Sequence, residues 1–139
     1  MICSRISDRD VIFIIQFIGL LLERTKMLDD LEFTNNWFGH NAEKIWNQLL
    51  PQIKPTKILE IGSYEGRSTC YLIEKNNWAE VCEIHCIDNW EGGFEEKKIN
   101  DLQDKLIEER FDYNTKLTID KVSSTINLVK HKGFSDHKL

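Results

Sequence analysis

The stretch of sequence that decides the fold runs from Lys57 to Ser68 and reads KILEIGSYEGRS. A short apolar segment ending at Ile61 leads into a turn that carries glycines at positions 62 and 66. The residues from Ser68 to Lys75 then have helical character. Strand, glycine turn and helix in this order predict the first half of a βαβ unit.

Two further strands are predicted downstream of this unit. Residues Glu83–Asp88 form the second, which the polar and glycine residues of Asn89–Gly93 stop. An amphipathic helix is expected from about Glu95 to Arg110, with a connection over residues 111–120. Residues Ile126–Lys130 form the third strand, which ends at Gly133–Ser135. The β-α-β-α-β order predicts an α/β fold with a parallel sheet and right-handed crossovers.

The segment ahead of this unit contains two predicted helices. Residues 1–26 hold the apolar run VIFIIQFIGLLL at 11–22, which predicts an extra N-terminal helix that packs in a core or lies on an apolar surface. The run is shorter than the roughly 20 residues of a membrane span and has no signal-peptide features. In the next segment, His40 or Asn41 is expected to cap a helix, and Pro51 and Pro55 to bound a connector.

Composition limits the classes of protein to consider. The 139 residues suffice for one domain, and a net charge of −5 provides no basic field for binding nucleic acid. The four cysteines, at positions 3, 70, 82 and 86, are too unevenly spaced for a disulfide framework. We therefore expect a cytoplasmic protein, with no membrane span and no nucleic-acid partner.

The glycine turn predicts a ligand site, because glycine allows close backbone approach and a helix N-terminus offers unpaired N–H groups. Tyr64 stands where a dinucleotide motif needs its middle glycine, and no lysine follows Gly66 as a P-loop requires. Glu60 would repel a pyrophosphate but attract a cation. Asp88, at the tip of the second strand, is placed to accept ribose hydroxyls. The four positions 60, 62, 66 and 88 together suit an adenosyl cofactor with a positively charged tail, although each acid alone could be an ordinary solvated side chain.

The same motifs resemble those of the class I S-adenosylmethionine-dependent methyltransferases. The segment EIGSYEGRS at 60–68, followed by IHCIDNWEG at 84–92, is similar to the branch whose cofactor loop reads E-I-G-S-x-E-G-R-S and whose second strand ends in I-D-x-W. Similar segments are NWFGHN at 36–41, RFDYN at 110–114 and KGFS at 132–135. The resemblance covers about residues 33–139 and implies a Rossmann-like fold, so residues 27–139 are expected to form a partial methyltransferase domain.

The resemblance implies a role for each matched position, with S-adenosyl-L-methionine as the cofactor. Glu60 and Gly62 would line the methionine end, and Ser63, Tyr64 and Gly66 would form the loop beneath it. Asp88 would hold the ribose. Asn89 or Trp90 would flank the adenine, and Phe134 and Ser135 would close the adenine side.

The sequence departs from the family in having only three predicted strands, whereas such domains usually have seven. In the family the first strand pairs with the fourth, so the edge of Lys57–Ile61 is expected to be bare and open to self-association or a partner chain. We expect half of a cofactor site, with no catalytic base identified. The alternative is a non-catalytic interaction module or split-enzyme half, and a nucleotide-binding domain is disfavoured.

A metal site is also disfavoured. Cys82 and Cys86 should face one side of their strand and His85 the other, so that they cannot converge on one ion. The cysteines are instead expected to be small buried thiols, and His40 to cap or pack.

Overall fold

The computed structural model describes residues 30–92 and 101–137. The predicted N-terminal helix and the expected start of the helix at Glu95 lie outside these ranges. The chain divides into two compact units, Met1–Leu31 and Glu32–Leu139, and the fold below is that of the second. Within the described ranges, no helix has the length and apolar character needed to cross a membrane.

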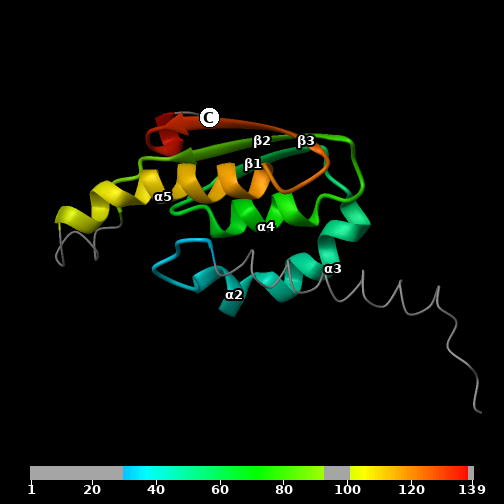
Figure 1. Ribbon diagram of the computed structural model, residues 1–139, viewed down its shortest axis with the longest axis horizontal. Helices are drawn as coiled ribbons and strands as arrows, with labels where there is room; N and C mark the ends of the chain where they lie inside the picture. The colour runs from blue at the N-terminus through cyan, green and yellow to red at the C-terminus, as the bar shows by residue number, and fades with distance from the viewer. Residues whose placement is uncertain (1–29, 93–100, 138–139) are drawn as a thin grey trace, which may run out of the picture. The chain divides into compact units, whose positions relative to one another are not determined.

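The second unit is an α/β structure, which confirms the predicted fold class (Figure 1). The ends of its strands match the predicted ends or lie one or two residues beyond them. The elements are, in chain order, α2 (Trp37–Asn41), α3 (Glu43–Ile53), β1 (Lys57–Ile61), α4 (Arg67–Lys75), β2 (Val81–Asp88), α5 (Asp101–Ile119), β3 (Thr125–Lys132) and the 3-10 turn η2 (Ser135–His137).

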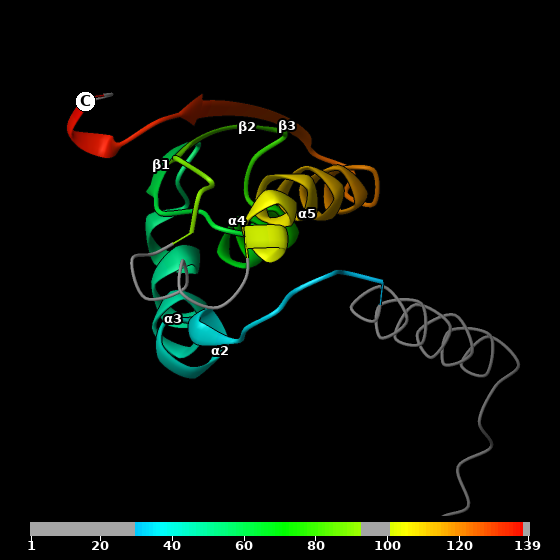
Figure 2. The ribbon, with the colours of Figure 1, turned by 90° about the vertical axis from the view of Figure 1, so that its left-hand side faces the viewer.

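The three strands form one parallel sheet in the order β1-β2-β3, so β2 is central and β1 lies at an edge. Both views show α4 and α5 on the same side of this sheet (Figure 2). The register places Glu60 beside Cys86, and Cys86 beside Lys130. These three side chains therefore lie on one face, because residues opposite each other in a sheet share a face.

The core lies between the sheet and the two helices. On the helix-facing side of β2, Cys82, Ile84 and Cys86 are completely buried, together with Phe111 of α5. The other face of the sheet is much more open, and Val81 remains 53% exposed there. Parallel sheets are usually covered on both faces, whereas the described residues supply helices for one.

Two expectations for the α2–α3 region are wrong. His40 and Asn41 do not cap α3, because both lie within α2, and Ala42 is the N-cap without a side-chain bond. Pro51 does not end the helix, which continues to Ile53. Proline costs a helix the N–H bond of its own position. Because Pro51 stands in the last turn, on an exposed position, the helix loses little by continuing for two more residues.

The helix α5 is longer at its C-terminal end than the sequence predicts. Residues 111–119, expected to be a connection, continue the helix. Phe111, Thr115 and Thr118 are buried at helical spacing, and the two threonine hydroxyls donate to carbonyls one turn earlier, at 2.7 and 2.8 Å. Threonine and asparagine on the buried face conceal the helical pattern, since such side chains weaken helix propensity unless they bond back to the backbone.

Candidate functional site

The loop between β1 and α4 is a tight turn built on left-handed backbone angles. Gly62, Tyr64 and Gly66 have φ values of 81°, 49° and 81°. The Gly66 N–H donates to the Ser63 carbonyl at 2.8 Å, and the Gly62 N–H donates to Ile87 of β2 at 2.9 Å. Left-handed angles cost a residue with a Cβ atom about 1–2 kcal/mol. Tyr64 therefore needs a partner that holds it in place.

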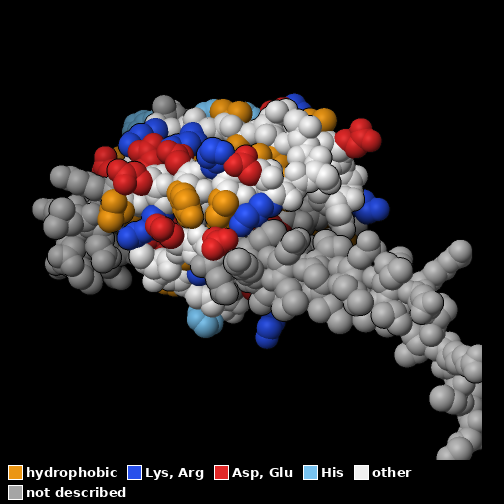
Figure 3. Space-filling view, viewed as in Figure 1, with side chains coloured by type: hydrophobic (Ala, Val, Ile, Leu, Met, Phe, Trp, Pro, Cys, Tyr) orange, Lys and Arg blue, Asp and Glu red, His pale blue; other side chains and the backbone are white. Residues whose placement is uncertain are grey.

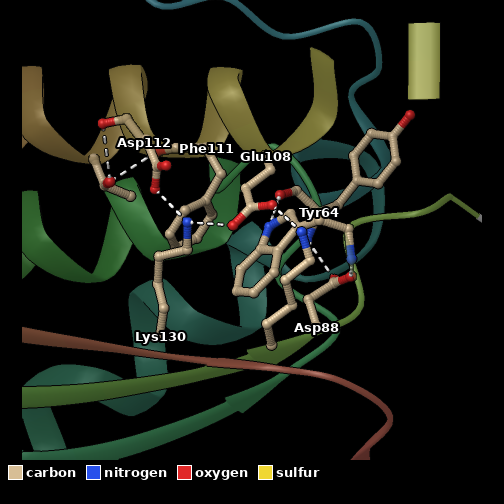
Figure 4. A network of polar contacts seen from close by, with 9 residues as sticks. Tyr64, Asp88, Glu108, Phe111, Asp112 and Lys130 are labelled. Atoms are coloured by element: carbon tan, nitrogen blue, oxygen red, sulfur yellow. Dashed lines mark hydrogen bonds and ion pairs between the residues drawn. The ribbon is translucent and has the colours of Figure 1, made fainter. Parts of the chain in front are cut away.

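Asp88 is that partner. Its Oδ2 accepts the Tyr64 N–H at 2.8 Å, while its Oδ1 accepts the N–H of Trp90 at 2.7 Å. The Trp90 indole N–H in turn donates to the Tyr64 carbonyl at 2.9 Å. Figure 4 shows Asp88 beside Tyr64 at the ends of the strands. One carboxylate therefore joins the loops that follow β1 and β2, and two of its roughly four acceptor positions remain for other donors.

Glu60 lies on the same sheet face as Asp88, because it pairs with Cys86, two residues before Asp88. Glu60 is only 8% exposed, although the role expected for its carboxylate is to attract a cationic ligand. The hydroxyls of Ser68 and Thr69, in the first turn of α4, each donate to it at 2.5 Å. A carboxylate at a helix N-terminus is favoured by the helix dipole. Glu60 therefore attaches the first turn of α4 to β1.

The residues expected around an adenine differ in how far they are buried. Trp90 is 3% exposed and its ring packs 5.1 Å from that of Phe111, so of the two residues expected to flank an adenine, Asn89 is the more open. Asn89 and Ser135 are half-buried and Phe134 is 58% exposed. The end of β3 joins this group because the N–H of residue 133 donates to the carbonyl of residue 88 at 2.8 Å.

A charged network supports the buried tryptophan from the other side. Lys130 of β3 lies 4.8 Å above the Trp90 ring and donates to Glu108 and Asp112 of α5 at 2.8 and 2.7 Å (Figure 4). The hydrogen bond from Lys130, with a second from Lys132, lowers the pKa of Glu108. Burial lowers the pKa of Lys130, but its bonds to the two carboxylates outweigh this effect and raise it. The network ties α5 to β3 on a surface where charges of both signs alternate (Figure 3).

A small cavity of about 160 Å³ lies above the glycine loop. One wall is the loop itself, and the other is the chain that leads into α2. Its lining residues are Phe33, Asn35, Trp37, Phe38, Gly62, Ser63, Tyr64, Glu65, Arg67 and Ser68. The cavity size is close to that of an engineered 150 Å³ pocket that holds benzene. It therefore accommodates a group of amino-acid size and is too small for a nucleoside.

Two buried polar side chains hold the two walls of this cavity together. Glu65 is 2% exposed and accepts the Thr34 N–H and hydroxyl at 2.6 and 2.9 Å, together with a 2.9 Å ion pair from Arg110. The Asn114 amide bonds both backbone groups of Glu32 at 2.8 Å and also donates to the Glu65 carbonyl. Neither residue carries a sequence signal of its own for this role. The one indication in the sequence is that Glu65 and Asn114 lie in segments 60–68 and 110–114, which are similar to methyltransferase motifs.

Cys82, Cys86 and His85 are arranged as predicted. Cys82 and Cys86 are buried on the helix-facing side, whereas His85 lies on the open face and contacts His131 at 2.7 Å. Burial, and after it the nearby Glu60, raises the pKa of Cys86 to about 12, so this side chain is a neutral thiol. Among the residues that the structure describes, no three potential metal ligands cluster. His40 is exposed.

Comparison of the chain with family models, curated proteins and solved structures finds no match. The motifs and the geometry of the loops at the strand ends therefore carry the functional information. That geometry brings together the glycine loop, Asp88, Asn89 and the end of β3. It keeps Glu60 and Trp90 beneath the surface as supports.

The two outer glycines of the loop provide a matched test of this geometry. A Cβ atom at Gly62 would meet nothing within 4 Å, so Gly62→Ala should cost only the left-handed backbone penalty of about 1–2 kcal/mol. At Gly66 a Cβ atom would lie 3.0 Å from the Phe111 ring. Gly66→Ala should therefore lose about a further 1–3 kcal/mol through overpacking. Urea unfolding measures both values, and equal losses would show that Gly66 is not pressed against α5.

Proposed function

We propose that the glycine loop and Asp88 form half of an S-adenosyl-L-methionine site, and that the chain is the cofactor-binding half of a methyltransferase domain. The observation that carries the proposal is the hydrogen bond from the Tyr64 N–H to Asp88. It brings the carboxylate that would hold a ribose against the loop that would hold the methionine end. The motif resemblance supports the same assignment for both positions.

The dimensions of the site agree with this division of the ligand. The 160 Å³ cavity above the loop is suited to an amino-acid group, whereas pockets that enclose a whole ligand of this class hold about 300–1,000 Å³. The ribose would lie outside the cavity, where the two remaining acceptor positions of Asp88 can take its two hydroxyls. Asn89 follows Asp88 in the chain and Ser135 follows the end of β3, and both would contact the base.

The cofactor, when bound, supplies an electrophilic methyl group on its sulfonium, for transfer to an acceptor that the sequence does not identify. The residues of this chain would bind and orient it, and alignment is the main contribution that proteins make to such a displacement. Glu60 and Glu65 contribute by holding the helix and the cavity wall in place. The free thiols of Cys70, Cys82 and Cys86 are consistent with a reducing compartment such as the cytoplasm.

A second candidate function is docking of another chain along β1. The Thr56 carbonyl and the Gly62 N–H both bond to β2. Because alternate residues of a parallel strand bond to the same neighbour, the backbone groups of Lys57, Leu59 and Ile61 point to the outer edge. Leu59 and Ile61 are each 53% exposed. Exposed strand edges of this kind pair with other chains.

The space beside this edge is large enough for an added strand. An open groove of about 570 Å³ runs along β1 and is walled on its other side by α3. Trp46, Leu49 and Ile53 line it, and the last two are 44% and 58% exposed. A strand laid in the groove would cover apolar surface and complete the backbone hydrogen bonds of β1.

Calorimetry with S-adenosylhomocysteine tests the first proposal. We expect micromolar binding that falls at least tenfold in Asp88→Asn, because the amide removes the charge and one acceptor oxygen for the ribose hydroxyls. The exposed Asp120→Asn is the matched control, since it removes the same charge at the far end of α5 and should bind normally. A folded wild-type protein that binds no ligand would contradict the proposal.

Light scattering tests the docking surface. We expect the wild-type protein to self-associate through the β1 edge, and Leu59→Lys to reduce this strongly, because an edge lysine opposes strand pairing. Val81→Lys is the control, since Val81 is equally exposed, at 53%, but lies on the central strand. A monomeric wild-type protein, or equal effects of the two substitutions, would count against the edge.

A further inference from the structure

Arg67, the first residue of α4, is a half-buried cation without a carboxylate partner among the described residues. Its guanidinium carbon lies 4.2 Å from the centre of the Phe33 ring, and its Nε is buried without a hydrogen-bond acceptor. Arginine is seldom buried unless it is paired. Burial lowers the pKa of Arg67, which is the effect expected for a charge that lacks compensation, although Glu65 and Glu43 partly oppose it.

The two carboxylates whose charges act on Arg67 are those of Glu65 and Glu43, and neither forms an ion pair with it. Glu65 uses its carboxylate to bind Thr34 and Arg110. Glu60 accepts the hydroxyls of Ser68 and Thr69. The positive charge of Arg67 is therefore available to an anionic group that enters the cavity, which it lines.

The cavity offers complementary groups for both charges of an amino acid. Near Arg67 lies the N-terminus of α4, where the N-cap residue is Gly66 and no side chain caps the helix. The positive end of the helix dipole at this position attracts anions. The cavity is also lined by Trp37 and Tyr64, whose rings lie 5.4 Å apart. Aromatic faces attract ammonium groups. A carboxylate toward Arg67 and an ammonium toward the rings match the zwitterion of an amino acid.

We propose that Arg67 is the anchor for the α-carboxylate of a ligand that ends in an amino acid, and that this cavity selects such ligands over nucleosides that lack one. The inference rests on the proposed function, because it assigns the cavity to the methionine end of the cofactor. A phosphate is the less suitable anion here, since a second negative charge would lie near the carboxylate of Glu65.

Two ligands separate this inference from the cofactor proposal. S-adenosylhomocysteine carries the amino-acid group, whereas 5′-methylthioadenosine has the same nucleoside and thioether without it. By calorimetry we expect the wild-type protein to bind S-adenosylhomocysteine about 10- to 100-fold more tightly, the range typical of a charged hydrogen bond. Arg67→Gln should remove most of this difference and leave the affinity for 5′-methylthioadenosine unchanged.

Lys75→Gln is the matched control, because it removes one positive charge at the other end of the same helix and should keep the wild-type preference. Thermal melting of each variant establishes that it is folded. If Arg67→Gln does not fold, Arg67→Lys retains the charge but not the planar fork, and should bind S-adenosylhomocysteine more weakly than the wild type.

Equal wild-type affinities for the two ligands would overturn the role of Arg67 and leave the cofactor proposal intact. An Arg67→Gln variant that weakens both ligands equally would have the same meaning. Binding of neither ligand by the folded wild-type protein would overturn both proposals. If inorganic phosphate at millimolar concentration displaced bound S-adenosylhomocysteine, Arg67 would be a general anion site. That result would reject the proposed selectivity for amino acids.

Discussion

The loops at the strand ends depend on one carboxylate that accepts two backbone N–H groups. Asp88 holds Tyr64 and Trp90, and both of these residues have left-handed backbone angles, with φ of 49° and 54°. Each angle costs about 1–2 kcal/mol, and hydrogen bonds to a charged acceptor offset a cost of that size. Without Asp88, each loop would adopt a different backbone conformation of lower free energy. The glycine loop and the chain after β2 would then no longer form one surface.

Two other buried carboxylates attach neighbouring segments of the chain to this region. Glu60 attaches the first turn of α4 to β1, and Glu65 attaches the chain around Thr34 to the glycine loop. Neither is a solvent-exposed acid awaiting a ligand. The acidic character of the motif therefore builds the frame of the site, and Asp88 alone combines a structural role with acceptor positions that a ligand can use.

The sequence predicts the sheet well because its signals are local. The apolar runs of the strands are short and end at glycine or polar turns. The alternation along β2 places Cys82 and Cys86 on one face of the sheet and His85 on the other face. Long-range polar contacts have no such signal. The bonds from Asn114 to Glu32 and from Lys130 to Glu108 join residues 82 and 22 positions apart. The burial of Trp90 depends on α5, whose C-terminal half is concealed by threonine and asparagine on its inner face.

The central claim, that Asp88 couples the two loops, is tested most directly by comparing the backbone amide NMR spectra of the wild-type protein and of Asp88→Ala. Because one carboxylate accepts both N–H groups, its removal should shift the amide protons of Tyr64 and Trp90 together and speed the hydrogen exchange of both. A folded variant in which only one of these two amides changes, or neither does, would contradict the account.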